Sequence, residues 1–301
     1  MAAPAPSSLL DPRVLQKIGR LDLIARQVVE GFISGRHQSP YHGFSVEFAQ
    51  HREYVPGDDV RFIDWKVYAK SDRFFIKEYE EETNLTCTIA LDASASMGYR
   101  SESVSKYTYG SFLAASLAYL LLRQSDAVGL TLFHHELVSV VPPLSASGHL
   151  ETITATLETS RPDHDGDIGA VLGLLAEKVR RRGIVVVISD CFGDLAGTLR
   201  GLHQLRQRRH EVIVFHLLDE AEVEFPFQHL TRFEGLEGLG QVLTDPRALR
   251  TAYLKELRRF RDGLKRGCRG VGIDMVEVTT HMPLDETLTR FLGLRRARRG
   301  R

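Results

Sequence analysis

The run from Ile184 to Ser189 is the feature that most constrains how this chain can fold. It contains five β-branched residues and no charge, a pattern typical of a strand buried on both faces of a parallel sheet. From residue 84 onward, other apolar strand patterns alternate with helical patterns. This alternation predicts a doubly wound α/β domain, with a mostly parallel sheet covered by helices on both faces.

The expected elements of this domain follow from its hydrophobic periodicity. We expect strands at 85–91, 127–133, 137–141, 184–189, 212–217 and 271–278, and helices at 106–124, 148–159, 168–182, 195–209, 246–267 and 283–292. Two basic runs, 180–182 and 208–210, fall at the ends of expected helices. Cations interact favourably with helix C-termini, which is sufficient to explain these runs.

The first 83 residues have a different composition. Apolar residues recur every three or four positions from Val14 to Ile33, which predicts a helix, whereas residues 44–82 are aromatic, charge-dense and β-like. We therefore expect three parts: an N-terminal helix with a small β-rich accessory module at 1–83, the α/β domain at 84–293, and a basic tail at 294–301.

The charge balance excludes some classes of function. The 301 residues include 39 Lys and Arg against 39 Asp and Glu, so the formal net charge is zero. No bulk positive charge attracts phosphates, which argues against a general binder of nucleic acid or of membrane surfaces. Any partner must be recognised by a local site, and we expect no specific nucleic-acid partner.

The sequence also indicates a compartment. Cys87, Cys191 and Cys268 are far apart and lack the spacing of a metal site. The N-terminus has no pattern of a secretory signal, and the apolar stretch 111–122 is shorter than the roughly 20 residues that a membrane span requires. We therefore expect a cytoplasmic protein without a membrane span.

A candidate site lies where two expected strands end. Asp92, Ser94 and Ser96 directly follow the first strand of the domain, and Asp190 follows the strand 184–189. Ligands of open α/β sheets bind beyond the carboxyl ends of the strands, so these side chains meet if the two strands are neighbours. Their carboxylate and hydroxyl oxygens suit Mg²⁺, which keeps several waters.

Other interpretations of the same residues stay open. Asp92 and the serines can instead cap the next helix. A metal-dependent hydrolase, either a phosphatase or a nuclease, could use the same carboxylates with a histidine as base. The candidates for that base are His134, His135, His164 and His216. An aspartate nucleophile would need a carboxylate two residues on, where Ser94 stands. No nucleotide-binding glycine motif is present.

A second signature occupies residues 47–66 in the N-terminal module. Pro56-Gly57 predicts a type II turn, and charges of alternating sign surround the only tryptophan. The residues of this signature are Arg52, Asp58, Asp59, Arg61, Asp64 and Trp65. They form either a network of ion pairs that clamps the module or a surface that docks a partner. A nuclease is disfavoured because no E-x-K follows on the next strand.

The D-x-S-x-S motif of Asp92, Ser94 and Ser96, together with Asp190, resembles the metal-ion-dependent adhesion site of von Willebrand factor A domains. The resemblance implies that a metal ion there accepts an acidic residue of a partner protein. The family's middle threonine corresponds to Gly166 in this chain, so that ligand is missing. Asp165 and Asp167 are the residues that would replace it through water.

A longer series of motifs resembles the family called domain of unknown function 58. It includes the signature at 47–66, the run 77–82 with the D-x-S-x-S-M that follows, 215–222, 225–227, 233–237, 249–253 and 280–284. This resemblance implies a von Willebrand A-like fold and a functional tie to MoxR-type AAA+ ATPases, but no reaction. We therefore expect a non-enzymatic protein that docks such a partner, with Mg²⁺ at the contact.

The C-terminal segment Leu294 to Arg301 carries five arginines and no acid. It is typical of a solvated chain end. The alternative is a weak contact with RNA, anionic lipid or an acidic partner.

Overall fold

The structure, a computed structural model, describes residues 11–35, 48–54, 65, 67–68, 73–79, 85–235 and 240–299. The chain divides into two compact units. One comprises Met1–Gln38 together with Leu85–Arg301, and the other comprises Ser39–Asn84.

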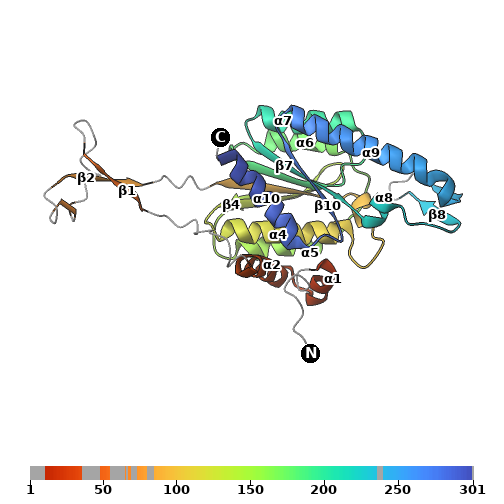
Figure 1. The fold of residues 1–301 in the computed structure, drawn as a ribbon, viewed down its shortest axis with the longest axis horizontal. Coiled ribbons are helices and arrows are strands. Elements are labelled where there is room, and N and C mark those ends of the chain that lie inside the picture. Colours follow the sequence, from red (N-terminus) through yellow and green to blue (C-terminus); the bar gives the residue numbers. More distant parts are fainter. Residues whose placement is uncertain are drawn as a thin grey trace. The chain divides into compact units, whose positions relative to one another are not determined.

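The larger unit contains the predicted α/β sheet (Figure 1). Its six strands are β3 (Thr86–Asp92), β4 (Ala127–Phe133), β5 (Leu137–Leu144), β6 (Ile184–Ser189), β7 (Glu211–Leu218) and β10 (Asp274–Thr279). Their order across the sheet is β10-β7-β6-β3-β4-β5. All neighbours are parallel except the hairpin of β4 and β5, which confirms the mostly parallel sheet.

The order of the strands reverses between β3 and β6. The chain runs outward from β3 through β4 to the edge strand β5, and then returns to place β6 on the other side of β3. Every residue of β6 is buried, as its β-branched sequence predicts for a central strand. The carboxyl ends of β3 and β6 therefore form the switch point at which α/β sheets bind their ligands.

Helices cover both faces of the sheet (Figure 1). One layer consists of α2 (Leu21–Gly35), α4 (Lys106–Leu122), α5 (His149–Thr159) and α10 (Leu284–Arg299). The other consists of α6 (Ile168–Lys178), α7 (Leu195–Gln207) and α9 (Pro246–Gly270). The apolar core divides into two clusters, one on each face of the sheet.

The N-terminal helix belongs to the larger unit, unlike the boundary expected at residue 83. Ile24, Ala25, Val28 and Val29 of α2 are buried in the same core cluster as α4. The reason is that α4 is apolar almost all round, so it needs cover on the side away from the sheet. The separate unit thus begins at residue 39.

This N-terminal segment is also not one continuous helix. A short helix α1 (Pro12–Leu15) and a 3₁₀ turn η2 (Gln16–Ile18) precede α2. Gly19 separates them with a φ of 76°, a left-handed conformation that glycine adopts without steric cost and that ends a helix.

The smaller unit contains an antiparallel pair, β1 (Phe48–Glu53) and β2 (Phe75–Tyr79). Beside it, Tyr68 stacks on Phe74 with ring centroids 4.4 Å apart, and Trp65 meets both rings edge-on. The predicted signature residues Asp58, Asp59, Arg61 and Asp64 lie outside the described residues, as does the side chain of Arg52.

Four short elements were not expected from the sequence. They are the 3₁₀ turn η4 (Ala95–Gly98), α8 (Glu220–Glu224), and the hairpin of β8 (Thr231–Glu234) with β9 (Gln241–Thr244). Across the described ranges, no helix combines the length and apolar character that crossing a membrane requires.

Candidate functional site

The structure brings Asp92 and Asp190 to one edge of the sheet, at the switch point. Asp92 is the last residue of β3, and Ser189 ends the neighbouring strand β6. Ser189 Oγ donates a hydrogen bond of 2.5 Å to Asp92 Oδ2, and Ser94 N donates one of 2.9 Å to Asp92 Oδ1. Asp92 is only 4% exposed, so its carboxylate is held inside the protein by both oxygens.

The serine loop continues from Asp92 into η4. The hydroxyl oxygens of Ser94 and Ser96 lie 3.1 Å apart, and Ser94 is buried. Two backbone hydrogen bonds tie this loop to the segment before α6: Ala95 N donates to His164 O, and Asp163 N donates to Ala93 O. The two loops at this edge therefore support each other.

Asp190 has a partner that the sequence interpretation missed. Lys106 Nζ donates a hydrogen bond of 2.7 Å to Asp190 Oδ2, while Phe192 N donates to Asp190 Oδ1. The side chains of Lys106 and Asp190 are 1% and 2% exposed. The positive charge beside Asp190 thus comes from the protein itself.

The Lys106 ammonium is enclosed on several sides. It donates a second hydrogen bond of 2.7 Å to Glu222 Oε1 and lies 5.1 Å from the ring centre of Phe192 and 5.8 Å from that of Tyr99. Burial alone would lower the pKa of Lys106, but Asp190 and Glu222 outweigh it and raise that pKa above its ordinary value. Lys106 is therefore a fixed, permanently charged cation.

The network extends to the ends of the next two strands. Asp219 follows β7 and caps α8, where a capping box joins it to Glu222. The carboxylate of Asp219 also accepts hydrogen bonds from Ser101 N and Thr280 Oγ1, each at 3.2 Å. Thr280 directly follows β10. One hydrogen-bonded belt therefore crosses the carboxyl ends of β3, β6, β7 and β10.

Asp92 has no cation of its own in this belt. Burial, together with the nearby negative charge of Asp190, raises the pKa of Asp92 to about 7, against the lowering effect of hydrogen bonds from Ser189 and Ser94. The carboxyl is consequently part protonated near neutral pH.

The residues present do not supply the donor set expected for Mg²⁺. Asp190 is already paired with Lys106, and both oxygens of Asp92 accept hydrogen bonds from the protein. Within the described parts of the chain, no group of three or more His, Cys, Asp or Glu side chains could hold a metal ion. Both carboxylates of the predicted cage are therefore engaged by other groups of the protein.

The loop before α6 does not complete the site either. A Cβ at Gly166 would lie 3.0 Å from Ser94 Cβ, so a threonine side chain there requires Ser94 to move. Asp167 Oδ1 accepts a hydrogen bond from Ala170 N and caps α6. Asp163 and Asp165 are exposed with Asp167 around the serine loop. The three acids therefore form the solvent-facing rim of this edge.

The histidines considered as general bases make hydrogen bonds and ring contacts with other groups. His216 is buried, its Nε2 donates to the backbone carbonyl of Asp190, and burial lowers its pKa to about 4. His134 stacks on His135, and its Nδ1 accepts hydrogen bonds from two backbone N–H groups. His164 meets both rings edge-on. Among the described residues, no histidine is hydrogen-bonded to the carboxylate of Asp92 or Asp190.

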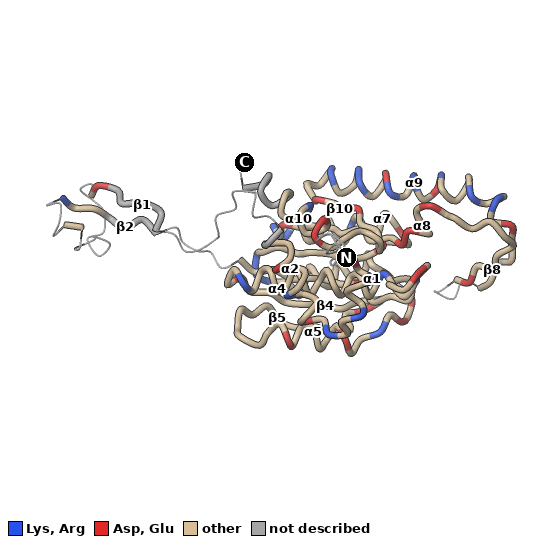
Figure 2. Tube along the Cα trace, turned by 60° about the horizontal axis from the view of Figure 1, so that its bottom comes forward, with Lys and Arg blue, Asp and Glu red and all other residues tan. Residues whose placement is uncertain are grey.

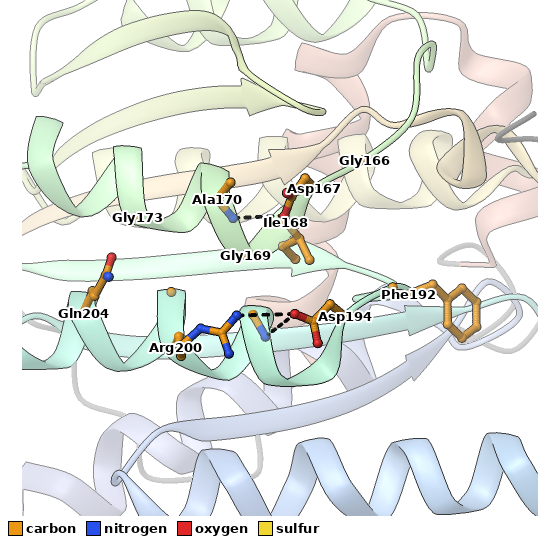
Figure 3. A pocket seen from close by; sticks show the side chains of 13 residues that line it. Gly166, Asp167, Ile168, Gly169, Ala170, Gly173, Phe192, Asp194, Arg200 and Gln204 are labelled. Carbon is orange, nitrogen blue, oxygen red and sulfur yellow. Dashed lines mark hydrogen bonds and ion pairs between the residues drawn. The ribbon is translucent and has the colours of Figure 1, made fainter.

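A polar groove adjoins the rim (Figure 3). It has a volume of about 510 Å³ and lies between the starts of α6 and α7, from Gly166 to Arg200 and Gln204. The two helices touch through glycines, because a Cβ at Gly169 or Gly201 would lie under 3 Å from the backbone of the other helix. Asp194, which caps α7, and Asp167 stand at its walls.

Sequence signals for the missed residues existed. A lysine at the first position of a helix faces the positive end of the helix dipole, which is unfavourable unless another group compensates. Lys106 occupies that position in α4. The glycine pairs 169/173 and 197/201 are spaced four apart on expected helices, a pattern that permits the close approach of α6 and α7.

Fold and site together define an α/β protein with a closed polar belt at the switch point of its sheet. The chain belongs to the family described as "Protein of unknown function DUF58", whose model matches residues 50–263. An uncharacterized protein of Mycobacterium tuberculosis (strain ATCC 25618 / H37Rv) is 27% identical over 98% of this chain and 96% of its own length. One from Mycobacterium avium is 28% identical over 44% of this chain and 77% of its own length.

Two solved structures are also similar. A conserved hypothetical protein BatB from Bacteroides thetaiotaomicron has 17% sequence identity and a TM-score of 0.46, and covers 69% of this chain and 97% of its own. An aerotolerance-related membrane protein from Bacteroides fragilis has 17% identity and a TM-score of 0.43, with 70% of this chain and 97% of its own covered.

Proposed function

We propose that the chain is a non-enzymatic interaction protein that docks a partner at the carboxyl edge of β3 and β6. The partner is a MoxR-type AAA+ ATPase, as the resemblance to the DUF58 family implies. We also propose a von Willebrand A-like fold for the larger unit. Its support is the reversal of strand order beside β3 and the D-x-S-x-S motif of Asp92, Ser94 and Ser96 at that point.

The docking proposal rests on one observation: the carboxylates of the belt are bonded to other groups of the protein. Each buried carboxylate accepts hydrogen bonds from the protein, and Asp190 and Glu222 share the Lys106 ammonium. A carboxylate whose oxygens are held by hydrogen bonds and an ion pair within the protein is poorly placed to act as a nucleophile or as a general base toward a substrate. What the belt does is hold the surrounding loops, so the rim is pre-organised for binding.

The exposed features of the edge suit recognition of a protein surface. Asp163, Asp165 and Asp167 offer three carboxylates on one short loop, and the groove begins directly beside them at Gly166. Acidic side chains on a rim steer and orient a basic partner surface. Because Lys106 already neutralises Asp190, docking at this edge does not depend on Mg²⁺.

The proposal is tested with a purified MoxR-type ATPase from the same organism, whose affinity for the full chain is measured by biolayer interferometry. Replacing Asp163, Asp165 and Asp167 together by Asn should slow association and so weaken binding by roughly tenfold, since rim charges act mainly on the association rate. The control replaces Glu30, Glu151 and Glu177, exposed acids of the helices, by Gln. Equal affinity of both variants for the ATPase would contradict docking at this edge.

A further inference from the structure

Three helices on one face of the sheet end at the opposite edge from the candidate site, and basic residues gather there. The residues of this basic edge are Lys178, Arg180, Arg181, Arg182, Arg208, Arg209, Lys265, Arg266 and Arg269. They are distant in sequence but lie at or beyond the C-terminal ends of α6, α7 and α9. Figure 2 shows the Lys and Arg positions along α9.

The sheet brings these segments side by side. β6, β7 and β10 are adjacent and parallel, and Ile184 is in register with Glu211, so Arg182 and Arg209 precede neighbouring strands by the same two residues. The turns also contact one another. His210 Nε2 donates to Val179 O, and Arg206 Nη1 donates to His210 O.

Another bond links the third turn to the first two: Arg206 Nε donates to Val271 O, between α9 and β10. The buried ring of His210 lies at the centre of this contact, and burial together with the positive charges of Arg208 and Arg182 lowers its pKa. The three basic turns therefore form one continuous surface.

The charge of the basic edge is largely uncompensated. All nine cationic side chains are exposed, and among the described residues only Lys265 has an ion pair, with Glu277 at 3.3 Å. The acids of the same edge are fewer: Glu177 is exposed, and Glu211 and Asp274 are half-buried where their strands begin. Favourable interaction with the helix dipole needs a cation in the last turn. The helix expected to end at residue 182 ends at Lys178, so this interaction does not explain Arg181 and Arg182 after all.

The net charge of the whole chain is zero, so any attraction for phosphates must come from a local surface. We propose that the basic edge is such a surface and binds the phosphate backbone of double-stranded nucleic acid without sequence preference. Seven of the nine cations are arginines, whose planar guanidinium groups bind phosphate with two hydrogen bonds. The turns at 178–183, 206–210 and 265–273 contain none of the exposed large apolar side chains. Membrane-surface binding and protein interfaces both draw on such side chains.

The residues of these turns also indicate which form of nucleic acid binds and whether its base sequence is recognised. The one aromatic ring in these three turns, that of His210, is buried, so unpaired bases have no exposed ring on which to stack. The helices reach this edge only with their C-terminal ends. Five of the seven arginines lie beyond the ends of α6 and α7, and the other two, Arg266 and Arg269, lie near the C-terminal end of α9. Binding is therefore to the backbone, which contributes affinity but no sequence readout.

The test is fluorescence anisotropy of a labelled DNA duplex of about 25 base pairs, titrated with the full chain. With about five phosphates neutralised, the dissociation constant should rise by roughly 10²–10³ between about 50 and 200 mM NaCl. Two duplexes of unrelated sequence should bind alike. Absence of binding at the lower salt concentration, or binding unaffected by salt, would overturn the proposal.

Matched variants locate the surface. Replacing Arg181, Arg182, Arg208 and Arg209 by Gln should weaken duplex binding at least tenfold and reduce the salt slope by about three to four, roughly one per lost phosphate contact. The control replaces four exposed arginines elsewhere, Arg20, Arg26, Arg161 and Arg232, by Gln. Equal losses in the two variants would refute the assignment.

Two further probes separate the alternatives. Vesicles containing phosphatidylserine are tested by co-sedimentation, and polyglutamate is tested as a competitor of the duplex. Duplex binding that exceeds vesicle binding and resists a charge-matched amount of polyglutamate supports the proposal. Preferential binding to vesicles would indicate that the basic edge binds a membrane surface, and preferential binding to polyglutamate would indicate an acidic protein surface. Either result would overturn the proposal.

Discussion

Replacing Lys106 by Met should destabilise the larger unit by about 3–5 kcal/mol, because breaking a buried ion pair leaves its partners charged in a medium of low polarity. Asp190 and Glu222 would both lose their cation, and the rings of Tyr99 and Phe192 would lose the ammonium between them. Met is unbranched and shorter than Lys only by the terminal ammonium position, so the change in the free energy of unfolding reports mainly the missing charge. It is measured by urea denaturation followed by circular dichroism.

An exposed lysine provides the control for Lys106→Met. Lys265 pairs with Glu277 at 3.3 Å, but its side chain is 57% exposed. An ion pair of this kind contributes about 0–1 kcal/mol, so Lys265→Met should leave the stability nearly unchanged. Adding Asp190→Asn and Glu222→Gln to Lys106→Met should restore part of the lost stability, since no buried charge then lacks a partner. A loss below about 1 kcal/mol for Lys106→Met would show that the belt does not depend on this cation.

Replacing Asp92 by Asn should make the unfolding free energy less dependent on pH. The pKa of Asp92 is about 7 in the folded protein, and its ordinary value is 3.8. Between these values the folded state binds the extra proton, so stability falls as pH rises and the loss is complete above pH 7. Asn resembles the protonated form and does not ionise. The variant should therefore gain about 2–3 kcal/mol relative to the wild type between about pH 5 and pH 8.

The surroundings of Asp92 decide how this prediction is checked. The groups that face its carboxyl are Asp190, whose charge repels it, and Ser189 and Ser94, which donate hydrogen bonds. Asp165→Asn removes one exposed carboxylate from the adjacent loop and serves as the control. Urea denaturation at several pH values gives both differences. A constant difference between Asp92→Asn and the wild type across this range would mean that Asp92 is not the titrating group.

The strands of the sheet could be predicted because the residue pattern of each segment alone indicates a strand. Ile184–Ser189 and Ala127–Phe133 have the same bounds in the structure as in the prediction. The convergence of Asp92 and Asp190 followed from one rule, that parallel strands present their carboxyl ends at one edge. Residues 44–82 were expected to be rich in β structure, and β1 and β2 lie there.

The role of Lys106, the place of α2 and the basic edge could not be predicted, because they depend on contacts between segments that are far apart in the sequence. Lys106 reaches Asp190 and Glu222 across 84 and 116 residues of sequence, so its role required knowing which elements meet. The helix α2 has an ordinary amphipathic pattern, and its place in the larger unit follows only from the apolar surface of α4. The basic runs at 180–182 and 208–210 each resemble a helix end, and only the strand order joins them into one surface.

Lys106, rather than a metal ion, supplies the positive charge of the candidate site. The most direct test is the unfolding free energy of the wild type measured with and without about 10 mM MgCl₂ at constant ionic strength. A site with a dissociation constant of about 1 mM would add about 1.4 kcal/mol under these conditions. We predict no difference. A Mg²⁺-dependent stabilisation that disappears when Ser94 and Ser96 are replaced by Ala would contradict this account.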